Sequence, residues 1–309
     1  METTQISTDL TQQIIHICAA IKTGNKMKEV IKKADVLIEA LPYIKRFHNK
    51  VVVIKYGGST MEEEEFRHGI LEDIVFLSYV GLKPILVHGG GPFINQKLKE
   101  RGKKIVFVDG LRYTDAETIE VVKTVLTEIN ESILKELVEL GGRARSLSGK
   151  DFIRAKKKAI KKDVGFVGDI TSVNTILLKN LLDTSCIPVV GPLGVGVDKQ
   201  IYNINADSVA SELAAALSAE KLVLLTNVQG IMFDIANEDS IFSTLKIKDA
   251  LDLIKKKVIQ EGMIPKVKAC INALKKGVNK THIIDGRISH ALLLEIFTDK
   301  GIGTEIIHE

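Results

Sequence analysis

The stretch that decides the fold is 51–59, which reads V-V-V-I-K-Y-G-G-S. Its four leading β-branched residues are typical of a strand that is buried on both faces of a parallel sheet. Lys55 follows where this strand is expected to surface, and Gly57 and Gly58 come soon after it. Ligands bind at the carboxyl ends of such strands, and glycine lets backbone N–H groups approach an anion closely. The stretch indicates a phosphate or carboxylate site, although taken alone it also fits an exposed lysine before a glycine turn.

Apolar runs alternate with helical periodicity along the rest of the chain. The expected strands are 84–87, 104–108, 187–190, 222–226, 281–284 and 303–307, with a basic hairpin or flap at 154–160 and 165–173. The expected helices are 61–80, 115–140, 205–217, 247–258, 265–276 and 290–297, with a further helix ending near residue 100. Strands that alternate with helices predict an α/β fold with a mostly parallel sheet covered on both faces.

Two amphipathic helices are expected ahead of the first strand, at 7–21 and 27–40. Gly24 and Asn25 end the first of them, and Pro42 lies near the end of the second. The predicted division of the chain is an N-terminal helix at 1–25, an N-lobe at 26–219 and a C-lobe at 220–309.

Composition narrows the class of protein. The chain has 309 residues, a formal net charge of +4 and 45% hydrophobic residues, which indicates an ordinary globular protein with a sizeable core. Basic clusters at 156–158 and 255–257 lack interleaved aromatic residues, so we expect no nucleic-acid partner. Cys18, Cys186 and Cys270 are scattered, which favours a reducing compartment. The absence of a secretory leader or an 18-residue apolar segment predicts a soluble protein without a membrane partner.

A second glycine motif, H-G-G-G-P at 88–92, follows the second expected strand. Gly89, Gly90 and Gly91 lie where a helix is expected to begin, so unpaired N–H groups and the positive end of the helix dipole are available to an anion. Pro92 suits the first helical turn. The motif matches neither the dinucleotide-binding pattern nor a Walker A loop. It predicts an anion site, with a plain tight turn as the alternative.

Four further polar residues have an ordinary structural interpretation, and two of them, Arg112 and Lys266, also have a functional one. In Y-N-I-N-A-D at 202–207, Asn205 can be a helix N-cap and Asp207 an acid that complements the dipole. Arg112 can bind a carboxylate in bidentate fashion or lie on the surface. Lys266 begins a helix, where a cation is unfavourable unless something negative lies nearby, and a solvated side chain is the alternative.

Taken together, six segments resemble the amino-acid kinase family in the same order, from about residue 50 to the C-terminus. They are K-Y-G-G-S at 55–59, V-H-G-G-G-P at 87–92, G-L-R at 110–112, L-S-G-K-D at 147–151, N-I-N-A-D at 203–207 and G-M-I-P-K-V at 262–267. Within the family they are most similar to the branch that uses ATP to phosphorylate the side-chain carboxylate of N-acetyl-L-glutamate in arginine biosynthesis. The resemblance implies a three-layer αβα sandwich, with the acyl substrate and dimerisation on the N-lobe and the nucleotide on the C-lobe.

The resemblance also implies roles for matching residues. Those that act on the transferring phosphoryl group are Lys55 and Lys266, with Asp207 orienting both lysines. Those that hold N-acetylglutamate are Gly90, Gly91, Arg112 and Asn203. Those that donate amides to phosphates are Gly57, Gly58 and Gly89. Phosphoryl transfer requires positioning and positive charge more than covalent chemistry, so these residue types suit the reaction. Mg²⁺ would arrive on ATP and needs no protein cage.

The chain ends resemble the arginine-inhibited, hexameric branch of the family. The segments that carry this likeness are the N-terminal helix, H-x-x-D-G at 282–286 and the stretch 295–304. They imply that arginine binds near His282, Glu295, Gly301 and Gly303 on the C-lobe, and that the N-terminal helix interlaces three dimers. The alternative is a helix that packs on its own domain. The PII signal protein is a further partner that the resemblance allows.

Three points stay open at the level of the sequence. The family often has Asp where this chain has Asn227, which leaves details of nucleotide binding undecided. A composition rich in Lys and Ile suits an AT-rich genome, which places the protein in a bacterial cytoplasm or a plastid stroma. The rival functions are a kinase of free glutamate or aspartate on the same fold and a non-catalytic arginine sensor.

Overall fold

The computed structural model describes residues 24–58, 61, 63–234, 237, 240–260, 262–298 and 301–308. The contacts divide the chain into two compact units, Met1–Arg46 and Phe47–Glu309. The helix expected at 7–21 lies outside the described residues. The expected joint between two lobes near residue 219 stays a prediction.

Helix α2 spans Gly24–Phe47 and is longer than the 27–40 expected from the sequence. Pro42 lies inside it rather than after it. Proline removes one N–H donor and disfavours a helix interior, but it does not always end the helix. Several apolar side chains of α2 are exposed, with Val36, Leu37 and Ile38 each more than 60% accessible.

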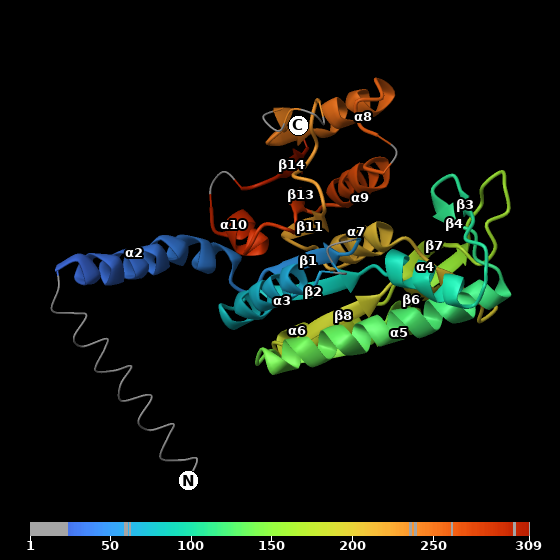
Figure 1. Cartoon of the computed structure of the whole chain (residues 1–309), viewed down its shortest axis with the longest axis horizontal. Coiled ribbons are helices and arrows are strands. Elements are labelled where there is room, and N and C mark those ends of the chain that lie inside the picture. Colours follow the sequence, from blue (N-terminus) through green and yellow to red (C-terminus); the bar gives the residue numbers. More distant parts are fainter. Residues whose placement is uncertain are drawn as a thin grey trace, which may run out of the picture. The chain divides into compact units, whose positions relative to one another are not determined.

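The unit Phe47–Glu309 is built around an eight-stranded sheet (Figure 1). In spatial order its strands are β12 (Thr244–Lys246), β14 (Thr304–Ile307), β13 (Lys280–Asp285), β11 (Lys221–Thr226), β1 (Val51–Tyr56), β2 (Lys83–His88), β8 (Ile187–Gly191) and β5 (Ala144–Ser148). All adjacent pairs are parallel except β13 and β14. The predicted mostly parallel sheet is confirmed, with β1 at its centre.

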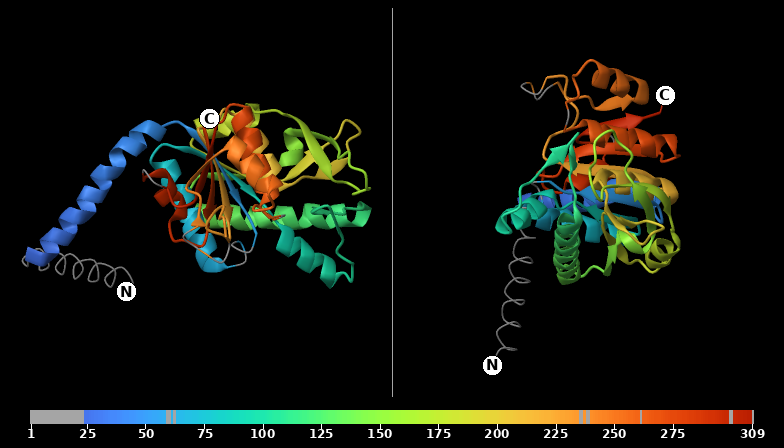
Figure 2. Two further views of the ribbon diagram at one scale, coloured as in Figure 1. Left: turned by 90° about the horizontal axis from the view of Figure 1, so that it is seen from above. Right: turned by 90° about the vertical axis from the view of Figure 1, so that its right-hand side faces the viewer.

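Helices cover both faces of this sheet, which completes a three-layer α/β/α arrangement (Figure 2). On one face lie α3 (Glu64–Tyr79), α5 (Ala116–Glu139) and α10 (Ala291–Ile296), with α4 (Gly91–Glu100) against α5. On the other lie α6 (Ile176–Asp183), α7 (Ala206–Ala216), α8 (Ile247–Lys255) and α9 (Ile264–Lys275). Successive strand residues point to opposite faces, so Lys55 faces the α7 side and Tyr56 the α3 side.

Two small sheets extend the α/β core. One has the order β10 (Ile201–Asn203), β9 (Leu193–Val195), β6 (Ile153–Lys157) and β7 (Gly168–Val173); the other pairs β3 (Phe107–Val108) with β4 (Leu111–Arg112). The basic hairpin expected at 154–173 is confirmed by the antiparallel pairing of β6 with β7. The strand expected at 104–108 is shorter and begins only at Phe107, while the turn at Gly110, whose φ is 78°, separates it from β4. Among the described residues, no helix is long and apolar enough to cross a membrane.

Candidate active site

The carboxyl ends of β1 and β2 bring the two glycine motifs side by side. The N–H of Gly89 donates a hydrogen bond of 2.8 Å to the carbonyl of Tyr56. A Cβ added to Gly57 would lie 3.1 Å from Lys55 Nζ and 3.3 Å from Gly89 N. Gly58 has a φ of 83°, a conformation that favours glycine. The missing side chain of Gly57 therefore leaves space for the Lys55 ammonium beside both loops.

Asp207 lies between two lysines that come from distant parts of the chain. Its Oδ1 is 3.0 Å from Lys55 Nζ, and its Oδ2 is 3.0 Å from Lys266 Nζ. Asn205 caps α7, with its side chain accepting a hydrogen bond from the N–H of Ser208, and so places Asp207 in the first turn. Lys266 comes from the first turn of α9. The structure thus brings together the three residues predicted to carry the chemistry.

Burial sets the electrostatics of this cluster. Burial lowers the pKa of Lys55, an effect that the nearby Lys266 charge adds to and the Asp207 carboxylate opposes. Burial alone would raise the pKa of Asp207, but the two ammonium groups outweigh it and hold that pKa below its usual range. Asp207 is therefore ionised at neutral pH. Lys266 is the more accessible of the two lysines.

A cavity of about 180 Å³ lies beside the triple glycine. Gly90, Gly91, Arg112 and Asn203 all line it, as the sequence predicted for one binding site. Arg112 is only 9% exposed, and its Nη2 donates to the carbonyl of Gly91 at 3.2 Å. Its Nη1 is buried and has no hydrogen-bond partner among the described residues. Because an unpaired buried guanidinium nitrogen is costly, this arrangement fits an anionic ligand.

A second cavity, of about 280 Å³, lies at the carboxyl end of β11. Its lining includes Thr226, Asn227, Met232, Met263 and Lys266, so Lys266 reaches from this cavity to the buried aspartate. Of these lining residues, only Asn227 and those in the motif at 262–267 were singled out from the sequence. The available signal for the others was the loop that follows β11, because ligands bind at the carboxyl edge of a parallel sheet.

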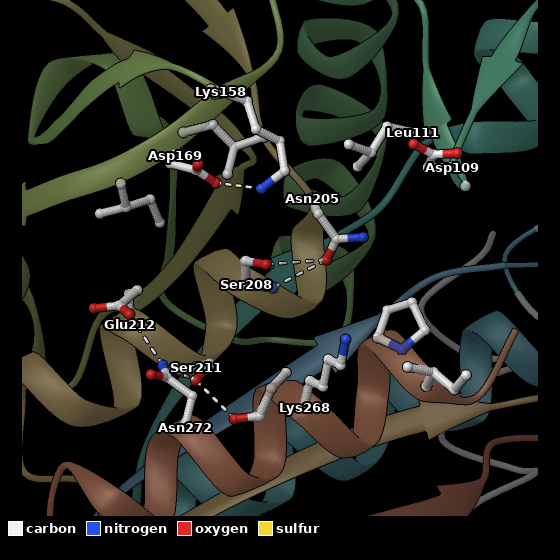
Figure 3. A pocket seen from close by; sticks show the side chains of 17 residues that line it. Asp109, Leu111, Lys158, Asp169, Asn205, Ser208, Ser211, Glu212, Lys268 and Asn272 are labelled. Atoms are coloured by element: carbon white, nitrogen blue, oxygen red, sulfur yellow. Dashed lines mark hydrogen bonds and ion pairs between the residues drawn. The ribbon is translucent and has the colours of Figure 1, made fainter. Parts of the chain in front are cut away.

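Another cavity, of about 830 Å³, adjoins the triple-glycine cavity (Figure 3). Lys158 and Asp169 form an ion pair at the β6–β7 side, while Ser208 and Lys268 project from α7 and α9. The residues common to both cavities are Gly110, Leu111, Ile204 and Asn205. The two cavities are therefore neighbours that share one wall. The larger one was not predicted from the sequence, because its walls come from five separate segments, 109–111, 158, 168–170, 204–212 and 264–272.

Three of the four predicted regulatory residues meet in a buried cluster. His282 Nδ1 lies 2.7 Å from Glu295 Oε1, and Lys221 Nζ lies 3.6 Å from the same oxygen. The N–H of Ile302 donates to Glu295 Oε2 at 3.2 Å, and a Cβ added to Gly301 would lie 2.6 Å from that oxygen. Sequence reasoning missed Lys221, whose side chain is buried although it begins a strand.

Charge pairing controls the carboxylate of this cluster as well. Burial alone would raise the pKa of Glu295, but hydrogen bonding and charge from His282, with Lys221 assisting, lower it overall. Burial lowers the pKa of Lys221. Gly303 has a different environment, since a Cβ there would lie 2.3 Å from the carbonyl oxygen of Ile283. Gly303 thus permits the close approach of β14 to β13 and does not contact Glu295 in any described interaction.

At the carboxyl edge of a parallel sheet, two lysines contact one buried aspartate between two cavities and beside two glycine loops. These features define a phosphoryl-transferring α/β enzyme. The chain belongs to the amino acid kinase family, whose family model matches residues 50–285. The family and fold predicted from the six motifs are thereby confirmed.

Similarity to individual proteins covers nearly the whole chain. It is 48% identical to the acetylglutamate kinase of Desulforamulus reducens, over 90% of this chain and 99% of that one. It is 49% identical to the acetylglutamate kinase of Thermoanaerobacter pseudethanolicus, over 91% of this chain and 95% of that one. Among solved structures, N-acetylglutamate synthase from Neisseria gonorrhoeae, complexed with coenzyme A and N-acetyl-glutamate, superposes with a TM-score of 0.80 at 26% identity. That match covers 89% of this chain but only 63% of the synthase.

Proposed function

We propose that this protein is an N-acetylglutamate kinase, which transfers the γ-phosphoryl group of ATP to the side-chain carboxylate of N-acetyl-L-glutamate. The observation that carries the proposal is the placement of Lys55, Asp207 and Lys266 between the triple-glycine cavity and the β11 cavity. Nearly half of all residues are identical to those of acetylglutamate kinases over nine-tenths of the chain. We assign the acceptor to the first cavity and the nucleotide to the second.

In the reaction, a carboxylate oxygen attacks the γ-phosphorus while the bond to the bridging oxygen of ADP breaks. The attacking carboxylate is already ionised at neutral pH, so no general base is required. Lys55 and Lys266 would place positive charge on opposite sides of the transferring group, where two polyanions must be brought together. Asp207 holds both ammonium groups in place at 3.0 Å. Gly57 and Gly58 would offer backbone N–H groups to the phosphates.

The lining of the acceptor cavity favours the acetylated amino acid over the free one. No acidic residue is among those that line it, so the ammonium group of free glutamate or aspartate would have no anionic partner there. Leu126, Val167 and Ile204 provide apolar surface for an acetyl group. Arg112, with Asn203 nearby, would pair with a carboxylate.

ATP is expected to bring its divalent cation with it. Among the described residues, no group of three or more His, Cys, Asp or Glu side chains is placed to hold a metal ion. Both oxygens of Asp207 face lysines, which leaves that carboxylate unsuited to a cation. We therefore infer that Mg²⁺ is bound by nucleotide oxygens and water, a mode that Mg²⁺ commonly adopts.

An acceptor-specificity assay tests the proposal. ADP release would be measured with N-acetyl-L-glutamate, free glutamate and free aspartate side by side, with hydroxylamine trapping the acyl phosphate. We expect turnover of the acetylated compound to exceed that of both free amino acids by at least about tenfold, because a desolvated, unpaired ammonium is costly. Faster turnover of free glutamate would support the rival kinase. No ADP with any acyl acceptor would support a non-catalytic sensor.

We further propose that arginine inhibits the enzyme and that the protein assembles as a hexamer. Glu295 is a buried carboxylate that lies 3.6 Å from the Lys221 ammonium and 2.7 Å from His282 Nδ1, and a carboxylate is a suitable partner for a guanidinium group. The exposed apolar residues of α2 provide surface for contact with other subunits. The same assay run with and without arginine tests the inhibition. A location in the cytoplasm or plastid stroma and binding of PII stay predictions.

A further inference from the structure

His88 is a fully buried titratable residue that the proposed mechanism does not use. It is the last residue of β2 and directly precedes the triple glycine. Its ring points to the α5 side of the sheet, away from the ion-paired lysines. A polar ring in this position needs hydrogen-bond partners, because burial without them is costly.

Both ring nitrogens face an oxygen. Nδ1 lies 2.8 Å from the carbonyl oxygen of Gly89, and Nε2 lies 3.0 Å from Oδ1 of Asn130. The Asn130 amide nitrogen in turn donates to the carbonyl of Leu147 at 2.9 Å. A neutral imidazole has a single N–H, so one of its two contacts lacks a hydrogen. A half-turn of the Asn130 amide only moves the mismatch to Leu147, so the network is one proton short.

The surroundings keep the ring neutral while no ligand is present. Burial lowers the pKa of His88 to about 4, although both hydrogen-bonding neighbours act to raise it. On β1, Tyr56 lies opposite His88, and burial raises the pKa of its hydroxyl well above the ordinary value, so it is uncharged. Lys55 points to the opposite face of the sheet. On the other flank, β8 contributes Gly191, where an added Cβ would lie 3.6 Å from Nε2, and α5 contributes uncharged Asn130.

The contact to Gly89 determines the direction of the next peptide group. None of the described peptide bonds is cis, and in a trans peptide the C=O and the following N–H point in opposite directions. When the ring holds the Gly89 carbonyl on the buried side, the N–H of Gly90 is directed away from the ring. Gly90 is the N-cap of α4 and lines the acceptor cavity, where that N–H can meet an anion.

We propose that His88 is a positioning residue, which gains a second ring proton when the anionic acceptor binds and then holds the Gly89 carbonyl so that the Gly90 N–H faces the acceptor. This inference rests on the proposed function, because the acceptor is the source of the negative charge. A nearby anion favours the charged form of an imidazole. The cation completes the network by donating to Gly89 and Asn130 at once, so binding and protonation support each other.

Two matched variants separate the two ring nitrogens. In His88→Asn the side-chain amide can take the place of Nδ1, and in His88→Gln it can take the place of Nε2. We expect the KM for N-acetylglutamate to rise at least about tenfold in His88→Gln and to stay within about threefold in His88→Asn, with the KM for ATP little changed in both. Circular dichroism and thermal melting establish that both variants fold. An equal loss in both variants, or no loss in either, would overturn the inference.

Proton uptake is the second measurement. Titration calorimetry of N-acetylglutamate binding near pH 7, in two buffers of different ionisation enthalpy, should show uptake of about one proton by the wild-type protein and much less by either variant. Acceptor affinity should correspondingly weaken as the pH rises from about 6 to about 9 in the wild type and stay nearly level in His88→Asn. Equal uptake in the wild type and both variants would contradict the role of His88.

Nitrogen-15 NMR of labelled histidine follows the ring without requiring turnover. The chain has seven histidines, and the two ring-nitrogen signals that are missing from the His88→Asn spectrum are those of His88. We expect both nitrogens to show protonated shifts only when N-acetylglutamate is bound. Absence of ADP release would count against the proposed function, whereas an unchanged His88 spectrum at saturating acceptor would count against this inference alone.

Discussion

At the scale of single residues, the site depends on one carboxylate held between two ammonium groups. Asp207 is 4% exposed and Lys55 is 7% exposed, so neither charge is compensated by bulk water. Each needs the other, because an isolated buried charge costs several kcal/mol. Lys266 is more accessible and completes the cluster from a different helix. The same three residues are the ones that would act on the phosphoryl group.

Replacing Lys266 tests its part in the chemistry. Lys266→Ala is expected to lower kcat on the order of 10²-fold or more, as loss of a group that stabilises the transition state does. Lys275→Ala, an exposed position on the same helix α9, is the matched control and should keep wild-type activity. Steady-state kinetics of ADP release measure both. An unchanged kcat for Lys266→Ala would remove this lysine from the mechanism.

Replacing Asp207 tests the electrostatics. Asp207→Asn leaves the buried Lys55 charge without its partner, so we expect the free energy of unfolding to fall by about 3 kcal/mol at neutral pH. The folded pKa of Asp207 lies below the ordinary value of 3.8, so its pairing stabilises the fold above that pH and is lost as the pH falls through the folded pKa. The difference between wild type and variant should therefore shrink on acidification.

Urea unfolding at several pH values measures this difference. Asp183→Asn is the control, because its partner Lys83 forms an ion pair in which the Asp183 side chain is 68% exposed. That pair should contribute less than about 1 kcal/mol. An Asp207→Asn variant as stable as the wild type at neutral pH would contradict the buried ion-pair account.

At the scale of elements, the carboxyl edge of the large sheet gathers both glycine loops and the lysine–aspartate cluster, while β4 and β10 of the small sheets supply Arg112 and Asn203. Strands β1 and β2 deliver the glycine loops, α7 delivers Asp207 and α9 delivers Lys266. Parallel strands make this possible because all their carboxyl ends lie at one edge. The buried cluster of Lys221, His282 and Glu295, proposed above to bind arginine, instead joins β11, β13 and α10.

Gly303 tests the packing of the edge strands. Gly303→Ala would place a Cβ 2.3 Å from the carbonyl of Ile283, a backbone atom that cannot move aside cheaply. We expect this variant to lose about 2 kcal/mol or more of stability, since β14 must separate from β13. Gly69→Ala, in helix α3 with nothing near the added Cβ, is the control and should be neutral or stabilising. Thermal melting compares them. Equal melting temperatures would show that this loop adapts to a side chain.

At the scale of the whole molecule, the two compact units are expected to have different roles, one in assembly and the other in catalysis. Met1–Arg46 carries the helices proposed for assembly, whereas Phe47–Glu309 contains the residues proposed for the active site and those proposed to bind arginine. We therefore expect catalysis to need only the second unit and the proposed hexamer to need the first. Exposed apolar residues on α2 agree with a role in association.

Truncation tests this separation. Deleting residues 1 to 25 should leave ADP-forming activity in place and abolish hexamers, because the proposed interlacing segment is lost. Sedimentation velocity gives the oligomeric state, and the acceptor assay gives the activity. A truncated chain that still sediments as a hexamer would disprove the interlacing role of this segment.

Much of the fold could be predicted from local patterns. The β-branched run of β1, the apolar run of β2 and the N-cap of α7 were recognisable because local sequence favours those elements directly. Other elements were missed. The edge strand β5, with the sequence A-R-S-L-S, is too polar to be distinguished from a loop, and β12 and α6 are too short for a clear period.

The sequence by itself determined the alternation of strands and helices, the glycine motifs at two strand ends and, through six ordered motifs, the family. Only the tertiary structure decided that Lys55 and Lys266 share Asp207, that Lys221 joins Glu295, and that His88 lies between two acceptor oxygens. The physical reason is that backbone preferences act over a few residues, whereas ion pairs and buried hydrogen bonds form between segments that only the packed sheet brings together.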